Sequence, residues 1–289
     1  MRASVLTATV IVGAILARVF GKLDYFPVTA GLVRSFLYIG LYIAWGVSVR
    51  KRVIQRQVRW YLTAVSVLMV FWFAVRTMKY YLVFDPDAAR HLWYLYYLPM
   101  LFIPLFSLLA AMSLGKQEDY RLPRRTLLLY VLAVLCLTLI LTNDFHRMVF
   151  GFPAGEVWTD KSYSYECGYY LAIGLEIVYA LTAFAIMVIK CRTSKRKKHL
   201  PIILFAVSIV YAFIYVSGVR WMQIIGGDIT AVQCLLFSSI LESCIRCGLI
   251  RTNTGYGALF EAGTLGAQIT DATIPCAILR LMHLSFRKQ

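Results

Sequence analysis

Ionisable side chains that interrupt long apolar runs are the first candidates for chemistry in this sequence. Arg76 and Lys79 lie one helical turn apart in one such run, and Glu176 lies at a similar depth in another. A charge at the centre of a membrane helix costs about 2.5–3.5 kcal/mol on insertion scales, so such a residue is a functional candidate. Arg76 and Glu176 are therefore expected either to pair with each other or to line a pocket for a small ligand. Lys79 has a further option, since a lysine near a span end can extend its amine to the lipid headgroups.

Glu242 and Arg246 form a second acid–base pair, near the end of the last apolar run. Residues four apart lie on the same face of a helix, which predicts an ion pair within that helix. This internal pair is the simplest account of both charges.

The segment 143–167 is the longest connection between apolar runs and the best exposed candidate site. With 25 residues it is too short to fold as a domain, yet long enough to lie as a lid over a helix bundle. Asp144 and His146 are two residues apart, a spacing that fits a metal pair only in the loosest sense. Helix capping or surface hydrogen bonding is the alternative, and the sequence leaves open whether these two residues bind a ligand.

Metal, redox and cofactor chemistry are not expected. Six of the seven cysteines lie in apolar runs or beside basic connections, and only Cys167 lies at the other surface, so no disulfide framework is predicted. Cys244-x-x-Cys247 spans one helical turn with no further Cys or His beside it, which makes a poor metal site. The sequence also lacks phosphate-binding, dinucleotide-binding, zinc-protease and serine-hydrolase motifs. We predict no catalytic residue and no cofactor.

The composition places these residues in a membrane. Of the 289 residues, 60% are hydrophobic and 15% are charged, and the mean hydropathy is +0.70. Soluble domains are about 45–50% apolar and about 25% charged, which excludes an ordinary soluble enzyme. A formal net charge of +16 in so apolar a chain is typical of a polytopic membrane protein with cationic loops. We therefore predict an all-α bundle of membrane-spanning helices.

Eight runs are long and apolar enough to cross a bilayer, which takes roughly 17–25 residues. They are expected at 4–20, 32–49, 60–84, 92–114, 126–142, 168–189, 200–219 and 229–250. The first run is short enough for a signal peptide, but no small-x-small cleavage site follows it, which favours a retained span. Pro99 and Pro104 predict a kink in the fourth run.

The distribution of cations over the connections predicts the orientation. The connections 50–59, 115–125 and 190–199 hold fifteen Lys and Arg, against five in the alternate connections. Cationic loops are retained in the cytoplasm, so both termini are predicted to be cytoplasmic. The dense run at 195–198 resembles a nucleic-acid site, but beside a membrane it more often marks topology and attracts anionic lipid headgroups. Membrane lipids are expected as partners, and nucleic acid is not.

Short motifs at the ends of the runs carry a family resemblance. The fifth run ends in Leu141-Thr-Asn-Asp-Phe-His146, the fourth contains Leu98-Pro99, and the last continues from Gly248 to Phe260. In order and position these motifs resemble the N-terminal seven-helix sensor region of bacterial membrane histidine kinases. The resemblance covers about residues 31–271. It implies an extra span and turn at 1–30, a seven-helix sensor domain at 31–250, and a cytoplasmic tail at 251–289 that is similar to the start of a PAS-like segment.

The resemblance implies a signal-input module of a two-component system in a bacterial plasma membrane. Members of the family continue into a phospho-acceptor helix and an ATP-binding domain. Here 39 residues follow Ile250, and His283 is followed by Leu-Ser-Phe and not by Glu. The chain is therefore expected to be a truncated relative without kinase activity. Its expected partners are a small ligand or a membrane state as the signal, and a second copy or a separate histidine kinase for output.

A small-molecule transporter or channel that uses Arg76 and Glu176 is the alternative function. Many transporters contain inverted repeats with broken helices, and the first four runs show no similarity to the last four. A channel needs a polar filter or a ring of charges, which the two residues alone do not form. The sensor is the favoured hypothesis.

Overall fold

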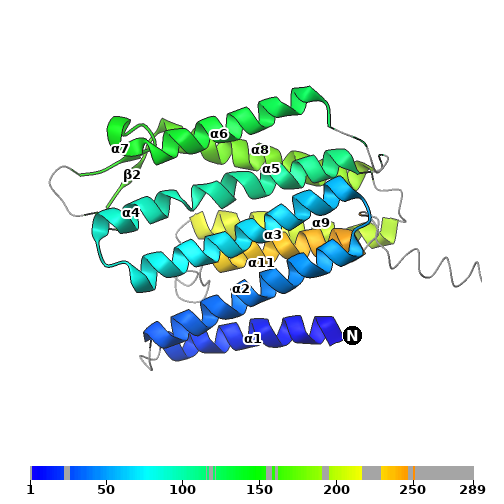
Figure 1. Ribbon diagram of the computed structural model, residues 1–289, viewed down its shortest axis with the longest axis horizontal. Coiled ribbons are helices and arrows are strands. Elements are labelled where there is room, and N and C mark those ends of the chain that lie inside the picture. The colour runs from blue at the N-terminus through cyan, green and yellow to red at the C-terminus, as the bar shows by residue number, and fades with distance from the viewer. Residues whose placement is uncertain are drawn as a thin grey trace, which may run out of the picture.

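The long elements of the described chain are all α-helices (Figure 1). The computed structural model describes residues 2–22, 27–114, 116, 120, 122–153, 158–159, 162–190, 195–216, 229–246 and 250. The helices are α1 (Arg2–Lys22), α2 (Pro27–Arg52), α3 (Arg56–Thr77), α4 (Pro86–Tyr94), α5 (Tyr97–Ser113), α6 (Leu127–Leu141), α7 (Asn143–His146), α8 (Cys167–Lys190), α9 (Lys195–Val216) and α11 (Ile229–Arg246). The short elements are the π-helix η1 (Met78–Leu82), the 3-10 turn η2 (Arg124–Thr126), and the antiparallel strands β1 (Phe150–Gly151) and β2 (Ser164–Tyr165).

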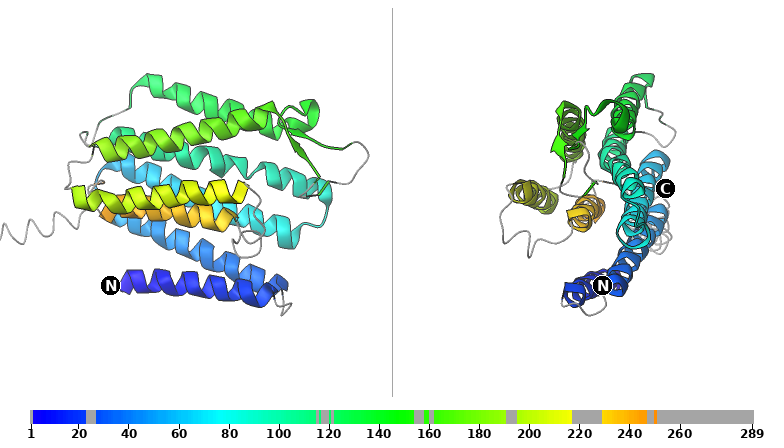
Figure 2. Two further views of the ribbon diagram at one scale, coloured as in Figure 1. Left: turned by 180° about the vertical axis from the view of Figure 1, so that it is seen from behind. Right: turned by 90° about the vertical axis from the view of Figure 1, so that its left-hand side faces the viewer.

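The helices form two layers that pack against each other. Seen end-on in Figure 2, α1 to α6 follow one another along a curved layer, and α8, α9 and α11 lie on its concave side. The largest hydrophobic cluster joins the layers and includes Tyr42 of α2, Phe73 of α3, Ile103 of α5 and Leu241 of α11. The predicted all-α helix bundle is confirmed.

Five helical segments are long and apolar enough to cross a membrane. They are Val28–Arg52, Arg56–Leu82, Pro86–Ser113, Arg124–Leu141 and Cys167–Lys190. The apolar stretches within α1 and α9, Thr7–Arg18 and His199–Ile214, are shorter. Helices therefore form at the predicted runs, while the count of eight spans stays a prediction.

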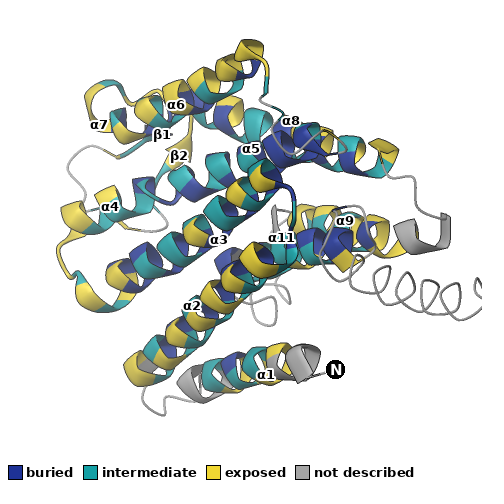
Figure 3. Cartoon of the chain, turned by 45° about the vertical axis from the view of Figure 1, so that its right-hand side comes forward, coloured by how far each residue is buried: buried dark blue, intermediate teal, exposed yellow. Residues whose placement is uncertain are grey.

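The outward faces of the bundle are apolar, as a hydrocarbon environment requires. Large hydrophobic side chains are exposed on α2, α6, α8 and α9, among them Phe36, Leu127, Leu171 and Phe213 (Figure 3). Soluble monomers rarely expose contiguous apolar surface on this scale. The exposed faces of these helices are consequently suited to contact lipid tails.

Helix α5 lies at the centre of the bundle. In its apolar stretch 72% of the residues are buried, against 22% in α6 and in α8. Between α4 and α5 the helix is interrupted at Leu95 and Tyr96, just before Pro99. A proline ring clashes with the carbonyl group four residues earlier, here that of Leu95, which accounts for the position of the break. Pro104 lies inside α5.

A small residue allows α2 and α3 to approach closely. A Cβ atom at Gly46 of α2 would overlap the side chain of Ser66 on α3. Ser66 Oγ donates a hydrogen bond across the same contact to the backbone oxygen of Tyr42, at 2.7 Å. Small residues at helix contacts and hydroxyl groups that bond across them are typical of membrane helix packing.

The two ends of the bundle differ in composition. At one end the C-terminal ends of α2, α5, α8 and α11 meet. There Gln55 Nε2 donates to the Ser113 carbonyl oxygen at 2.6 Å, and Lys190 Nζ lies 2.7–3.3 Å from three carbonyl oxygens at the end of α5. We call this the basic end, because the predicted cytoplasmic connections lie here. The opposite loop end carries α4, α7 and the β1–β2 pair, at the left of Figure 1. The side of the membrane that each end faces stays a prediction, and the tail 251–289 lies outside the described residues.

Candidate functional site

Asp144 is held by side chains of α4 at the loop end. Its carboxylate accepts a hydrogen bond from the Tyr94 hydroxyl group at 2.6 Å and pairs with Arg90 Nη2 at 3.1 Å. His91 Nε2 lies 3.4 Å from the same carboxylate. These contacts join α7 to α4 at the loop end.

His146 closes the turn that follows α6. Its Nδ1 accepts a hydrogen bond from the Met148 backbone N–H at 3.0 Å, and its Nε2 lies 3.1 Å from the Leu139 carbonyl oxygen. Both ring nitrogens are thus used within the turn, which fits the hydrogen-bonding alternative for Asp144 and His146. Ligand binding by these two residues stays a prediction.

Asn143 organises the same segment, and sequence reasoning did not single it out as a site residue. Its Oδ1 accepts the backbone N–H groups of Val149 and Phe150, both at 2.9 Å, and its Nδ2 donates to the Phe150 carbonyl oxygen and to Tyr94 Oη at 3.0 and 3.3 Å. The side chain is fully buried. An asparagine beside a helix end often forms hydrogen bonds with the local backbone. The position of Asn143 in the Thr-Asn motif at the end of the fifth apolar run could therefore have indicated this role.

Arg76, near the end of α3, and Lys79, in η1, are buried at the loop end, with 9% and 6% of each residue exposed. The Arg76 guanidinium lies 5.1 Å from the centre of the Tyr80 ring. The Lys79 amine lies 4.5 Å from the centre of the Tyr80 ring, 5.1 Å from Trp158 and 5.7 Å from Tyr96. Cations within about 6 Å of an aromatic ring centre are attracted by its quadrupole. Lys79 therefore lies inside an aromatic cluster.

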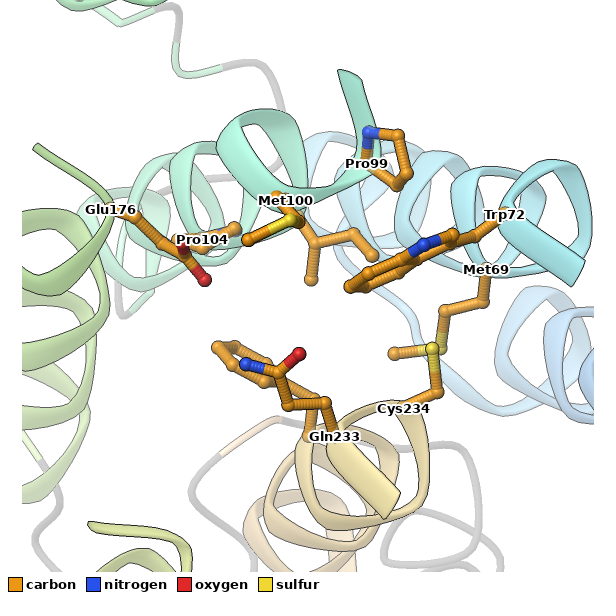
Figure 4. Close-up of a pocket in the computed structure, with 10 residues that line it drawn as sticks. Met69, Trp72, Pro99, Met100, Pro104, Glu176, Gln233 and Cys234 are labelled. Atoms are coloured by element: carbon orange, nitrogen blue, oxygen red, sulfur yellow. The ribbon is translucent and has the colours of Figure 1, made fainter. Parts of the chain in front are cut away.

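Glu176 lies apart from these cations and lines a small cavity of about 10 Å³ between α3, α5, α8 and α11. Figure 4 shows its carboxyl group directed into the cavity, toward the side of α11 that carries Gln233. Arg76 does not line this cavity, and no hydrogen bond or ion pair joins Arg76 to Glu176. The expected pair is not formed, because Arg76 packs on Tyr80 toward the loop end while Glu176 faces α11.

Trp72, Glu176 and Gln233, from three helices, are among the residues that line the cavity, although its walls are almost wholly apolar. Within the described residues, the Glu176 carboxyl group has no hydrogen-bond or ion-pair partner. Trp72 is 6% exposed, and its buried Nε1 has no hydrogen-bond partner in the described part of the chain. Sequence reasoning missed Trp72 and Gln233. Gln233 could have been singled out, because it is a polar amide within an apolar run. Trp72 could not, because it is one of many aromatic residues in these runs.

Glu242 joins α11 to α2 at the basic end. Arg52 Nη1 and Nη2 donate to the two carboxylate oxygens at 2.9 and 2.7 Å, and Trp45 Nε1 donates at 3.2 Å. Arg246 Nε donates to the same carboxylate at 2.8 Å, so the predicted pair within the helix is confirmed. The contacts with α2 were missed because the sequence does not reveal which helices are neighbours.

A comparison with known families agrees with this architecture. The model of the N-terminal 7TM region of histidine kinase matches residues 6–246, which span α1 to the end of α11. The division of the chain at residue 30 stays a prediction. No curated protein and no solved structure matches the chain. Because the match covers most of the sequence, the chain belongs to the family of N-terminal seven-transmembrane sensor regions of histidine kinases.

Proposed function

We propose that this chain receives a signal within its membrane bundle and transmits it along α11 to an output partner beyond the basic end. Family membership supports the sensor role. The position of α11 supports the route, because this helix carries Gln233 at the cavity and Glu242 at the basic end. Nine residues separate the two, a rise of about 13.5 Å along a helix.

The bond between Glu242 and Arg52 is the observation that carries the proposal. It fixes the end of α11 to α2 through two short hydrogen bonds, 2.9 and 2.7 Å long. The proposal is that α11 shifts between a position with this contact made, as in the structure, and one with it broken. Small shifts of a helix at an interface are an established way to transmit a signal.

The output step is proposed to lie outside this chain. The proposal places the protein in a bacterial plasma membrane with both termini in the cytoplasm. There a second copy of the chain or a separate histidine kinase would respond to the position of α11. The cationic connections support this orientation through their distribution.

A chimera tests the transmission route. The kinase core of a full-length member of the family is joined in helical register after Arg246, and autophosphorylation is measured in lipid nanodiscs. Arg52→Gln, which breaks the contact between helices, is expected to change the rate at least about threefold. Arg246→Gln is the matched control, because it removes a partner of the same carboxylate within α11. Equal rates in the unsubstituted and Arg52→Gln chimeras would refute the route.

The transporter alternative stays a prediction. It was based on a pair between Arg76 and Glu176, which the structure does not form. Solute flux into proteoliposomes that is lost in Glu176→Gln would support the transporter.

A further inference from the structure

A larger cavity than the one beside Glu176 lies between α5, α8, α9 and α11. Its volume is about 140 Å³. An apolar cavity of about 150 Å³ can take up a benzene molecule, so this one has room for a group of about six carbon atoms. Ala180 of α8 and Ala212 of α9 are among the residues that line it, and their short side chains leave this space open.

The walls of this cavity are apolar. Of the fourteen residues that line it, Ser107 and Ser208 carry hydroxyl groups and the other twelve are hydrophobic. Ser107 Oγ donates a hydrogen bond to the backbone oxygen of Ile103 within α5, at 2.8 Å, so this group is satisfied without a ligand. Apolar cavities stay free of water, and an empty one deprives its lining atoms of contacts. The walls therefore favour an apolar occupant.

The cavity is a groove that opens sideways between α8 and α9, and we call it the α8–α9 groove. Ile177 and Leu181 of α8 and Ile209 of α9 form its rim and are about half exposed, whereas Met187 and Leu241 form its floor and are buried. Helix α8 packs on α5 and α9 packs on α11, so the groove runs between two pairs of helices (Figure 2). Its rim belongs to the apolar faces that are suited to contact lipid tails.

The groove is narrow. Phe184 of α8 and Phe205 of α9 stack on each other, with ring centres 4.0 Å apart and an angle of 7° between the ring planes. A helix with its side chains is about 10–12 Å wide. Another helix does not fit between α8 and α9 beside this stack, whereas a single hydrocarbon chain does.

The groove covers the depth of one leaflet of a bilayer. Met187 and Ile177 lie three and thirteen residues before Lys190, the last residue of α8. At a rise of about 1.5 Å per residue these positions are about 5 and 20 Å from the end of the helix. The hydrocarbon core is about 30 Å thick, so the acyl chains of one leaflet fill about 15 Å. An acyl chain from the leaflet at the basic end therefore matches the groove in depth.

Cations stand at the same end of the groove. Helix α8 ends at Lys190, and α9 begins with the Lys-Arg-Lys-Lys run at 195–198. Each cation near a membrane surface strengthens the attraction of anionic lipid about fivefold. A lipid whose chain lies in the groove would have its headgroup at this end, so an anionic headgroup is favoured.

We propose that the α8–α9 groove is a binding site for an acyl chain of an anionic phospholipid from the leaflet at the basic end. This inference rests on the proposed function, since it names the chemical class of the signal.

The groove connects this lipid to the output helix. Phe237, Ile240 and Leu241 lie on one face of α11 and line the groove. Leu241 directly precedes Glu242, whose carboxylate accepts the two hydrogen bonds from Arg52. Occupation of the groove can therefore favour one position of α11 over another, which a sensor requires.

Photolabelling of the full chain in lipid nanodiscs tests the inference. The probe is phosphatidylglycerol with a diazirine in the middle of one acyl chain, present at a low mole fraction in phosphatidylcholine. Labelled positions are mapped by peptide mass spectrometry, and unlabelled phosphatidylglycerol or phosphatidylcholine is added as competitor. Label on the exposed face of α6 reports ordinary contact with lipid.

The inference predicts saturable labelling of α8 and α9 at the groove. Phosphatidylglycerol should compete at least about fivefold better than phosphatidylcholine with the same chains, the factor that one cation supplies. Ala180→Leu and Ala212→Leu fill the groove from its two sides and should each reduce the saturable label at least about threefold, because the chain loses atom contacts. Ala185→Leu and Ala206→Leu are matched controls at exposed alanines of the same helices outside the groove lining, and should retain the label.

Labelling at the groove that does not saturate, or that is no stronger than on α6, would mean ordinary lipid contact and would overturn the inference. Equal competition by phosphatidylcholine would overturn it as well. So would full labelling of Ala180→Leu and Ala212→Leu, with thermal unfolding measured to show that both variants are folded. Loss of dimers in these two variants with unchanged label would assign the groove to a second copy of the chain instead.

The fate of the proposed function is measured separately. If the groove is labelled as expected but the kinase chimera does not respond to Arg52→Gln, the lipid site stands and the route fails. If the chimera responds and the labelling does not saturate, the route stands and the lipid site is wrong.

Discussion

Arg52 and Glu242 form a bidentate ion pair that joins α2 to α11 at the basic end, with N–O distances of 2.9 and 2.7 Å. The two side chains are 25% and 19% exposed, so water screens the pair only partly. Bidentate arginine–carboxylate pairs are among the strongest hydrogen-bonded contacts in proteins. This contact is a direct, charged link between the two layers.

Breaking this link should destabilise the bundle. Arg52→Gln is expected to lower the free energy of unfolding by about 1–3 kcal/mol, less than for a fully buried pair because both groups retain some water. Arg246→Gln should cost less than about 0.5 kcal/mol, as its side chain is 56% exposed and its partner is four residues away. Unfolding by SDS in mixed micelles measures both. Equal losses of unfolding free energy in the two variants would show that the contact between α2 and α11 stabilises the bundle no more than the pair within α11 does.

Asn143 should be the most sensitive residue of the loop end. Asn143→Ala removes four hydrogen bonds and leaves the N–H groups of Val149 and Phe150 without their acceptor, at a cost of about 2–4 kcal/mol. Amide hydrogen exchange at these two positions should accelerate. Thr159→Ala, on an exposed hydroxyl group of the same loop, is the control and should leave that exchange unchanged.

Two glycines of α2 should respond in opposite directions to the same substitution. Gly46→Ala places a Cβ atom against Ser66 and should destabilise the bundle by about 1–3 kcal/mol through overpacking. At Gly40 an added Cβ meets nothing within 4 Å, so Gly40→Ala should stabilise by up to about 1 kcal/mol through helix propensity. Thermal unfolding of the two variants in micelles gives the comparison. A loss of stability in both would show that α2 does not pack on α3 as described.

Lys190 should stabilise the end of α5. Its amine lies within 3.3 Å of the carbonyl oxygens of Ala111, Met112 and Leu114, at the end of α5 where helix carbonyl groups run out of N–H partners four residues on. The Ala111 oxygen also accepts the Leu114 backbone N–H at 3.3 Å. Lys190→Met retains the apolar stem but removes the donor, and should cost about 1–2 kcal/mol. Lys116→Met is the control, and an equal loss there would mean that only net charge matters.

The membrane class and the helical elements could be predicted because they depend on local composition. Apolar runs of sufficient length predict helices, and the runs at 32–49 and 168–189 lie within α2 and α8. The pair of Glu242 with Arg246 could be predicted for the same reason, since helical geometry fixes the distance between residues four apart. The span count, the orientation and the function of the tail stay predictions.

Contacts between helices could not be predicted, because one sequence does not state which helices are neighbours. Arg76 and Glu176 were expected to pair on the basis of similar depth alone. A residue's depth gives only its position along the bundle axis. Arg76 and Glu176 lie at different positions around that axis and therefore do not meet. Arg52 was counted only as a topology signal, although its guanidinium makes the closest contact with Glu242.

The central claim is that Arg52 and Glu242 act together to couple α11 to the output. A double-substitution cycle in the kinase chimera tests it most directly, with autophosphorylation rates measured for Arg52→Gln, Glu242→Gln and both changes combined. If the two residues act through one contact, each single change alters the rate and the double variant matches the single variants. Effects that multiply independently, or rates that equal those of the unsubstituted chimera, would contradict the claim.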